Sequence, residues 1–469
     1  MQERTQKVSI GEKIGYSLGD GAGNFVFQAV IFFQMVYFTN VMGIDPNKAG
    51  TLLFLVMIWN AVFDVIMGVI ADKTSTKMGK FRPWILWSAL PFGLVFYLTY
   101  MTPDVAEGAK MAWATIIYFL LWTIYSVNNI PYSALGGVIT GDVVERTSIA
   151  SYRQVTAMAA AAIIQGFFIS MVTHFGNGNP NAPQGWRITV GIFAGVAVLF
   201  HLLTFFTTKE RIVPKKEAEA STKEAFSDLL KNGPWIATFI ATLFIFTNLA
   251  QRGGTLYYYF TNYLNPESLQ SFISTFGYRV DDVTAVGKAF ELFNMSGMAF
   301  TIVGIVLSNR LAKKFGKRNI FVLFLALATI FCAVFGLVSP TNTIATFLIN
   351  IGQTFSFGIT IPLLWSMIGD VADFSEWKFN RRATGVVFAG IVFALKFGLG
   401  FGQKLNGLFL TQFGYDSHNV TETAVHGIRL MASYFPAAMF LISIISLLFY
   451  KIDKNMEHQI QDELEARKG

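Results

Sequence analysis

Two polar side chains lie inside an apolar stretch of the sequence, where burying them costs free energy. Residues 49–70 read AGTLLFLVMIWNAVFDVIMGVI and contain Asn60 and Asp64 at positions i and i+4. This spacing puts both side chains on one face of a helix. An aspartate at the centre of a bilayer costs about 2.5–3.5 kcal/mol on insertion scales. The pair therefore predicts either a cation or proton site inside a membrane or a hydrogen bond between helices.

A second polar stripe follows in the apolar stretch 111–136. Trp122, Ser126, Asn129 and Ser133 are spaced at i, i+4, i+7 and i+11, which places them on one helical face. Small polar residues also hold membrane helices together by hydrogen bonds. The stripe thus fits either the wall of a polar pathway or helix packing.

Charged and amide side chains recur in other apolar stretches. Asp20 and Asn24 are again four residues apart, and Arg153 opens the stretch 152–174. Arg252 and Lys396 stand in the middle of theirs. A cation at membrane depth needs a carboxylate, a backbone carbonyl or an anionic ligand as its partner. These residues are therefore candidates for ligand binding, although a snorkelling Arg153 or a helix-paired Arg252 would also be satisfied.

The segment 369–385, GDVADFSEWKFNRRATG, mixes acids and bases at the end of an apolar stretch. Mixed charges at such a junction are typical of salt bridges that open and close between moving helices. We expect a gate here rather than a simple solvated loop, formed by Asp370, Asp373, Glu376, Arg381 and Arg382.

The composition places these residues in a membrane protein. The chain has 469 residues, of which 53% are hydrophobic and 14% charged, against about 25% charged in soluble domains. Its single cysteine, Cys332, excludes a disulfide within the chain and a cysteine metal site. The start of the chain lacks the features of a cleavable signal peptide.

Twelve apolar segments are long enough to span about 30 Å of hydrocarbon. They are 20–41, 49–70, 83–101, 111–136, 152–174, 188–207, 234–262, 286–308, 319–338, 341–369, 384–411 and 428–450. With both termini in the cytoplasm, the cytoplasmic segments hold 27 Lys and Arg residues and the outer loops hold 6. This asymmetry obeys the positive-inside rule. It explains the net charge of +7 better than a nucleic-acid partner does.

The sequence divides into two six-helix halves. The polar segment 208–233 separates residues 1–207 from residues 234–451, and residues 452–469 form a charged tail with short-helix character. Both halves place Gly-Lys before their third apolar segment, at 79–80 and 316–317. Such internal symmetry is typical of transporters whose substrate site lies near the midplane between two repeats.

Catalytic and nucleotide-binding motifs are missing from the sequence. It has no glycine-rich phosphate loop ending in Lys-Ser/Thr, and its five histidines lack metal-ligand spacing. We therefore expect no enzyme, no cofactor beyond a coupling cation, no bound metal and no obligate protein partner. An intramembrane enzyme or a sensor would need a nucleophile–base cluster or a signalling domain.

Several blocks of the chain resemble the glycoside–pentoside–hexuronide:cation symporters, a branch of the major facilitator superfamily. They are YSLGDGAGNF, IWNAVFDVIMGVIADKTSTKMGKFRPW, NNIPYSAL, ERTSIASYR, GDVADFSEWKFNRRATG and ALKFGLG, in the family's order. The resemblance implies a major facilitator fold in a bacterial inner membrane. It also implies symport of a sugar with H⁺ or Na⁺ by alternating access.

The resemblance also implies residue roles. Asp64, Asn60 and Ser126 match the family's cation site, with Asn60 replacing an acid of the sodium-coupled members. The sugar site is matched at Asn24, Asn129, Ser133, Arg153 and Lys396 and, in poorer alignment, at Trp365. Asp20 and Arg252 are added as binding candidates because of their place in apolar stretches, not because of the resemblance. Asn24 and Asn129 replace sugar-binding aspartates, and Ser133 replaces an aromatic contact.

These departures bear on the coupling ion and on the sugar. Sodium prefers several anionic oxygen ligands, whereas a lone carboxylate in apolar surroundings suits a proton. We therefore favour H⁺. Because two acids are replaced while three cations remain, an anionic uronide is possible, since arginine binds carboxylates well. A neutral pentoside or xyloside carrier and a lipid or lysolipid carrier are the alternatives.

Overall fold

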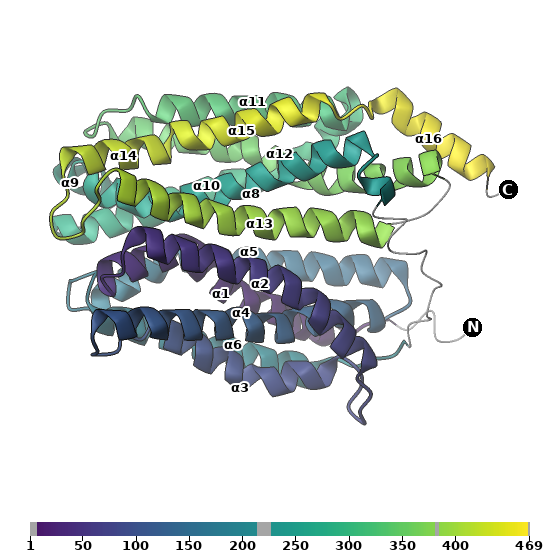
Figure 1. The fold of residues 1–469 in the computed structure, drawn as a ribbon, viewed down its shortest axis with the longest axis horizontal. Helices are drawn as coiled ribbons and strands as arrows, with labels where there is room; N and C mark the ends of the chain where they lie inside the picture. Colours follow the sequence, from purple (N-terminus) through teal and green to yellow (C-terminus); the bar gives the residue numbers. More distant parts are fainter. Residues whose placement is uncertain (1–6, 213–226, 380–383, 468–469) are drawn as a thin grey trace. The chain divides into compact units, whose positions relative to one another are not determined.

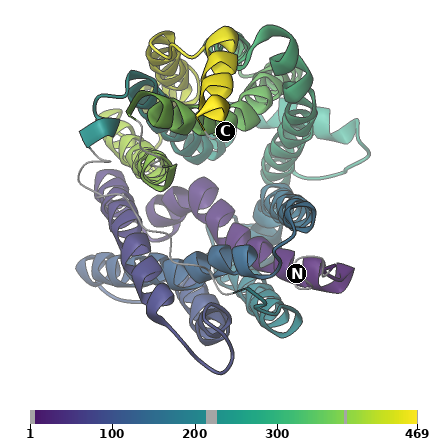
Figure 2. The ribbon, with the colours of Figure 1, turned by 90° about the vertical axis from the view of Figure 1, so that its right-hand side faces the viewer.

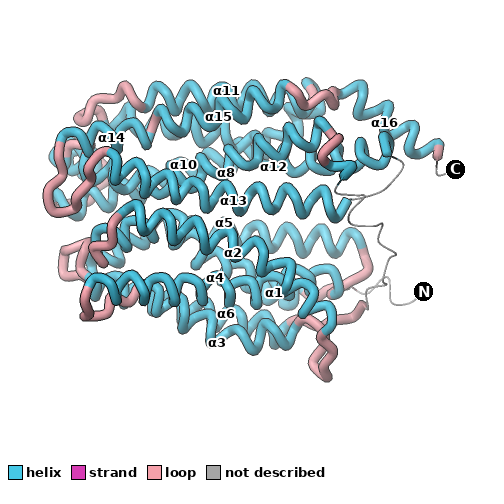
Figure 3. The backbone as a smooth tube through the Cα atoms, in the orientation of Figure 1, coloured by secondary structure: helices cyan, strands magenta, loops and turns pink. Residues whose placement is uncertain are grey.

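The computed structural model describes residues 7–212, 227–379 and 384–467. All regular elements in this part of the chain are helices, which Figure 3 draws in cyan, joined by loops in pink. The predicted all-helical class is confirmed. Two compact units are present: Met1–Lys216 with Val283–Glu291, and Glu217–Asp282 with Leu292–Gly469.

The first unit contains six long helices and a short π-helical turn, coloured purple to blue in Figure 1. They are α1 (Ile10–Val36), η2 (Tyr37–Val41), α2 (Pro46–Lys73), α3 (Arg82–Thr99), α4 (Glu107–Val138), α5 (Val143–Phe175) and α6 (Pro183–Thr207). Helix α1 packs on α5 and α6, while α3 packs on α4 and α6. The start of α10 belongs to this unit.

The second unit runs from teal to yellow in the figures. Its helices are α8 (Gly233–Asn262), α9 (Pro266–Ser274), α10 (Asp282–Phe315), α11 (Lys317–Phe335), α12 (Thr343–Phe379), α13 (Thr384–Gln412), α14 (Glu422–Ala432), α15 (Tyr434–Leu448) and α16 (Lys454–Ala466). Helix α8 packs on α13 and α15, and α11 packs on α12 and α15. These four pairings repeat those of the first unit, as the sequence symmetry predicts. Figure 2 views the helices of each unit nearly end-on.

Helix starts follow from local sequence. Four helices begin after a polar residue whose side chain accepts a hydrogen bond from a backbone N–H of the first turn. These capping residues are Ser9 for α1, Asp45 for α2, Asp142 for α5 and Asn232 for α8. A capping side chain satisfies donors that have no partner within the helix. The helices extend past the predicted apolar segments because these capped ends are polar.

The repeated Gly-Lys pair has a structural reason. Gly79 has a φ angle of +113° and Gly316 one of +85°. Residues with a Cβ rarely adopt these angles, so glycine lets the chain turn sharply into α3 and α11.

Eleven spans among the described residues are long and apolar enough to cross a membrane. The predicted third segment, 83–101, forms α3 but is not among them. Helix α3 has 18 residues, begins with Arg82 and contains Pro91, which lower its hydropathy. The count of twelve spanning helices therefore stays a prediction that depends on α3. The last predicted segment forms α14 and α15, which meet at Ser433 and count as one span.

Candidate functional site

The predicted cation-site residues meet between α2 and α4. The Asn60 side-chain nitrogen donates to Ser126 Oγ at 2.7 Å, and Ser126 Oγ donates to Asp64 Oδ1 at 2.6 Å. Asn60 and Ser126 are fully buried, and Asp64 is half-buried. The three side chains form one hydrogen-bonded chain from an amide through a hydroxyl to a carboxylate.

The Asn60 amide has one orientation that satisfies its neighbours. Its nitrogen also donates to the backbone carbonyl of Trp122 at 3.2 Å. A carbonyl only accepts hydrogen bonds, so the NH₂ group must point at Trp122 and Ser126. The amide oxygen therefore points away from Ser126.

A second predicted group meets between α1 and α5. Arg153 Nη2 lies 3.2 Å from Asp20 Oδ1, and the two side chains are 30% and 19% exposed. Asn24 donates from Nδ2 to the backbone carbonyl of Asp20 at 2.9 Å. The ion pair thus stands in a half-open setting, one helical turn from the Asn24 amide.

Two tyrosines that the sequence reading missed support Arg153. The rings of Tyr16 and Tyr132 stack with centroids 4.8 Å apart, and each hydroxyl donates to the other residue's backbone carbonyl, at 3.1 and 2.9 Å. The Arg153 guanidinium carbon lies 5.7 Å from the Tyr16 centroid and 5.1 Å from that of Tyr132. Such cation–π contacts favour a guanidinium at a fixed place. The tyrosine blocks YSLGD and IPYSA were visible in the sequence, but their partnership was not.

Asn129 and Ser133 continue the stripe on α4. Asn129 is half-buried, and Ser133 is exposed. The Asn129 amide lies beside α1, because a Cβ built on Gly23 would be 3.8 Å from its nitrogen. Asn129 therefore lies near the α1 segment that carries Asp20 and Asn24.

Arg252 of the second unit is held by amides. It is only 7% exposed, and its guanidinium donates to Gln353 Oε1 at 3.1 Å and to Asn350 Oδ1 at 3.4 Å on α12. Asn350 in turn donates to the backbone carbonyl of Phe293 at 3.1 Å. Arg252 thus ties α8 to α12 and α10, which is the helix-pairing alternative left open by the sequence.

The other predicted binding residues of this unit lie on α12 and α13. Lys396 is half-buried in the middle of α13. Trp365 lies on α12 and is 41% exposed. Their binding roles stay predictions.

The predicted gate contains a three-residue ion cluster. Lys317, at the start of α11, contacts both carboxylate oxygens of Asp370 at 2.7 and 2.8 Å, and Glu457 of α16 at 2.8 Å. Asp373 and Glu376 lie on the same helix as Asp370. The predicted gate residues Arg381 and Arg382 lie outside the described residues. The sequence reading missed Lys317 and Glu457, and with them the part played by the tail helix.

A second unpredicted contact holds the GKFRPW turn in the first unit. Glu210, just after α6, accepts hydrogen bonds from the backbone N–H groups of Lys80, Phe81 and Arg82 at 2.7, 2.7 and 2.8 Å. A carboxylate at a helix N-terminus satisfies free donors and the helix dipole. Glu210 thereby joins the end of α6 to the start of α3.

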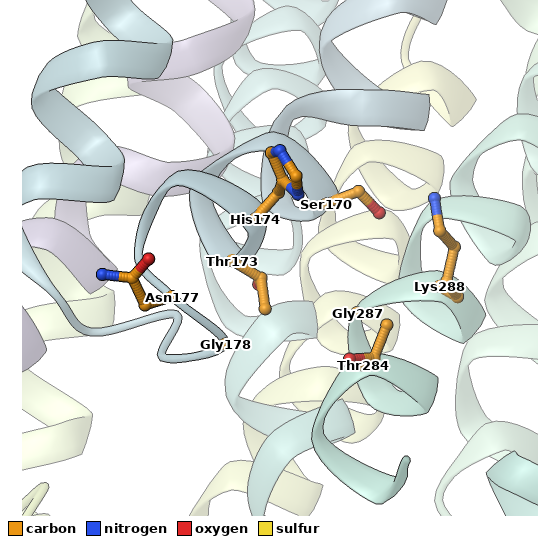
Figure 4. Close-up of a pocket in the computed structure, with 8 residues that line it drawn as sticks. All are labelled: Ser170, Thr173, His174, Asn177, Gly178, Thr284, Gly287 and Lys288. Atoms are coloured by element: carbon orange, nitrogen blue, oxygen red, sulfur yellow. The ribbon is translucent and has the colours of Figure 1, made fainter. Parts of the chain in front are cut away.

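A pocket of about 570 Å³ lies at the end of α5, apart from all of these residues (Figure 4). Thr173 and His174 line it on α5, with Lys288 on the early turns of α10. Nearby, buried Glu291 accepts from the Ser170 backbone N–H at 2.6 Å and the Ser170 hydroxyl at 2.5 Å. None of the predicted site residues lines this pocket.

Among the described residues, no group of three or more His, Cys, Asp or Glu side chains is arranged to hold a metal ion. The α2–α4 group brings together one carboxylate, one hydroxyl and one amide. Such a group can take up and release a proton, while the α1–α5 group can bind hydroxyls.

Long apolar helices in two similarly packed units, with ionisable side chains inside those helices, are the features of an integral membrane transport protein. The chain belongs to the MFS/sugar transport protein family, which it matches over residues 15–278 and 271–454. The resemblance to glycoside–pentoside–hexuronide:cation symporters is thereby confirmed, and the protein is not an enzyme.

Individual relatives agree with this assignment. The inner membrane symporter YicJ of Escherichia coli (strain K12) is 33% identical over 98% of this chain and 96% of its own. The isoprimeverose transporter of Lactiplantibacillus pentosus is 29% identical over 97% of this chain and 91% of its own. The solved structure of a D-xylose–proton symporter, 14% identical, covers 94% of this chain and 97% of its own with a TM-score of 0.63, which supports the fold.

Proposed function

We propose that this protein is a bacterial inner-membrane symporter that couples the uptake of a sugar or glycoside to H⁺ by alternating access. Its termini and the gate at Asp370 would lie in the cytoplasm, as the charge distribution favours. The observation that carries the proposal is the hydrogen-bonded chain from Asn60 through Ser126 to Asp64.

The orientation of Asn60 supports H⁺ over Na⁺. A sodium site needs several oxygen ligands around the ion. Asn60 presents its NH₂ group, not its oxygen, to Ser126, and the Ser126 hydroxyl lies within donating distance of Asp64 Oδ1 at 2.6 Å and of the Trp122 carbonyl at 3.1 Å. This arrangement leaves the carboxylate as the natural acceptor of a proton.

Coupling would pass along α4. Ser126 touches the proposed proton carrier, and Asn129, less than one turn later on the same helix, lies beside the Asp20 segment. A proton and a sugar that each favour the same arrangement of α4 must strengthen each other's binding by the same factor. No other protein is needed in this scheme.

A sugar is favoured over a lipid or lysolipid. Hydroxyl groups need paired donors and acceptors, which the Asp20–Arg153 pair and the Asn24 amide supply. The relative from Lactiplantibacillus pentosus is named as an isoprimeverose transporter, which supports a glycoside substrate. An anionic uronide is the alternative sugar substrate.

The test is uptake of labelled glycosides into proteoliposomes with an imposed H⁺ or Na⁺ gradient. We expect accumulation driven by the H⁺ gradient, and its loss in Asp64→Asn with sugar exchange retained. Asp72→Asn, which changes an acid that is 70% exposed, is the matched control and should accumulate normally. Accumulation by Asp64→Asn would refute the coupling role, and competition by lysolipids alone would refute sugar transport.

A further inference from the structure

We infer that Asp20 determines the charge preference of the substrate site, so that the protein takes neutral glycosides and discriminates against uronides. The inference rests on the proposed function, because it assumes that Arg153 contacts the sugar. It contradicts, for Arg153 and Arg252, the expectation from the sequence that surplus cations make the site suitable for an anion.

Asp20 neutralises the charge of Arg153 but leaves both side chains accessible to a ligand. Only Nη2 of Arg153 is bonded to Asp20, at 3.2 Å, and the guanidinium makes no second hydrogen bond within the described part of the chain. Both side chains remain partly exposed, at 30% and 19%. A ligand would therefore meet a carboxylate and a guanidinium together.

Tyr16 and Tyr132 stabilise the Arg153 guanidinium beside Asp20, so a second carboxylate is not needed there. Tyr16 and Tyr132 present their ring faces to Arg153, and their mutual hydrogen bonds hold both rings in place. The electron-rich faces add negative potential beside the guanidinium. The net charge of the group formed by Asp20, Arg153 and the two tyrosines is zero.

Arg252, another of the cations counted from the sequence, is also not available to an anionic substrate. Arg252 is only 7% exposed, and its two terminal nitrogens donate to Gln353 and Asn350. It serves helix packing in the second unit and is poorly placed to receive a substrate carboxylate.

This group suits hydroxyls rather than a carboxylate. A sugar hydroxyl can donate to Asp20 and accept from Arg153 at the same time, and the amides of Asn24 and Asn129 carry no charge. A uronide carboxylate would compete with Asp20 for the Arg153 guanidinium. The negative charge of Asp20 would also repel that carboxylate. Like charges brought together at a binding site cost enough to lower affinity roughly tenfold to a hundredfold.

The experiment compares matched ligands that differ only at C6. Phenyl β-glucoside and phenyl β-glucuronide form one pair, and the phenyl β-galactoside and β-galacturonide form another. Inhibition constants for counterflow of a labelled glycoside in proteoliposomes give the ratio of neutral to anionic affinity. We expect the wild-type protein to favour the neutral member of each pair by at least about tenfold.

Variants then test the cause of the preference. Asp20→Asn should shift the ratio toward the uronide by roughly tenfold or more, whereas Asp20→Glu and Asp72→Asn should keep the wild-type ratio. A wild-type preference for uronides, or an unchanged ratio in Asp20→Asn, would overturn the inference. If Asp20→Asn fails to fold, a wild-type preference for uronides would still overturn the inference. If the wild-type protein binds and moves no sugar of either charge, the proposed function fails as well, which is a different result.

Discussion

Replacing Glu210 should destabilise the first unit far more than its place in a polar loop suggests. Its carboxylate accepts three backbone hydrogen bonds, from Lys80, Phe81 and Arg82, at 2.7–2.8 Å. Phe81 is only 4% exposed, so water cannot easily replace the lost acceptor at that N–H. Glu210→Ala leaves all three donors without this partner.

The expected cost follows from these contacts. A hydrogen bond to a charged group contributes about 1.5–3 kcal/mol, and partly solvated donors fall at or below the lower end. Three such bonds give about 3–4 kcal/mol for Glu210→Ala. Glu210→Gln keeps one acceptor oxygen but loses the charge at the start of α3, and we expect about half that cost.

The assay is unfolding of the purified protein in mild detergent, followed by the fluorescence of its nine tryptophans. The matched control is Asp72→Asn. This variant breaks the ion pair between Asp72 and Lys80, whose charged atoms are 2.9 Å apart, and the Asp72 side chain is 70% exposed. Exposed pairs contribute about 0–1 kcal/mol, so the control should be nearly neutral. Equal stability of Glu210→Ala and Asp72→Asn would refute the reasoning.

Three further predictions concern the cation site and the tail. Asn60→Asp adds a second carboxylate beside Ser126 and should make uptake respond to Na⁺; continued indifference to Na⁺ would count against this account of the site. Lys317→Met removes the cation shared by two carboxylates and should cost about 2 kcal/mol in detergent unfolding, because the group is partly exposed; a neutral effect would contradict it. Hydrogen bonds from Gln459 and Trp377 lower the pKa of Glu463 from its usual 4.5. Docking of α16 should therefore be fully supported above pH 4.5 and weaken as the pH falls below it. Limited proteolysis of the tail measures this, and Glu463→Gln should lose the dependence.

Much of the architecture could be read from the sequence. The apolar segments form the expected helices, and the Gly-Lys pairs at 79–80 and 316–317 mark repeated turns. These features are local, since segment length and glycine conformation depend on neighbouring residues alone. Helix α3 also forms where it is predicted, but Arg82 and Pro91 lower its hydropathy, so it is not among the eleven candidate spans.

The candidate site could be predicted only as a set of residues. Polar groups inside apolar helices stand out because burying them is costly. Their partners did not stand out: Asp20 and Arg153 are 133 positions apart, and Glu12 binds Arg211 across 199 positions. Such pairs depend on how the helices pack, which no local pattern encodes.

By itself, the sequence determined that this chain is a membrane protein with a carboxylate, Asp64, inside an apolar segment. Only the tertiary structure decided what that carboxylate and the other charges meet. It joined Asp64 to Asn60 through Ser126, neutralised Arg153 with Asp20 and buried Arg252 among amides. The physical reason is that a charge's effect depends on the groups within a few ångströms of it, and packing brings those groups from distant helices.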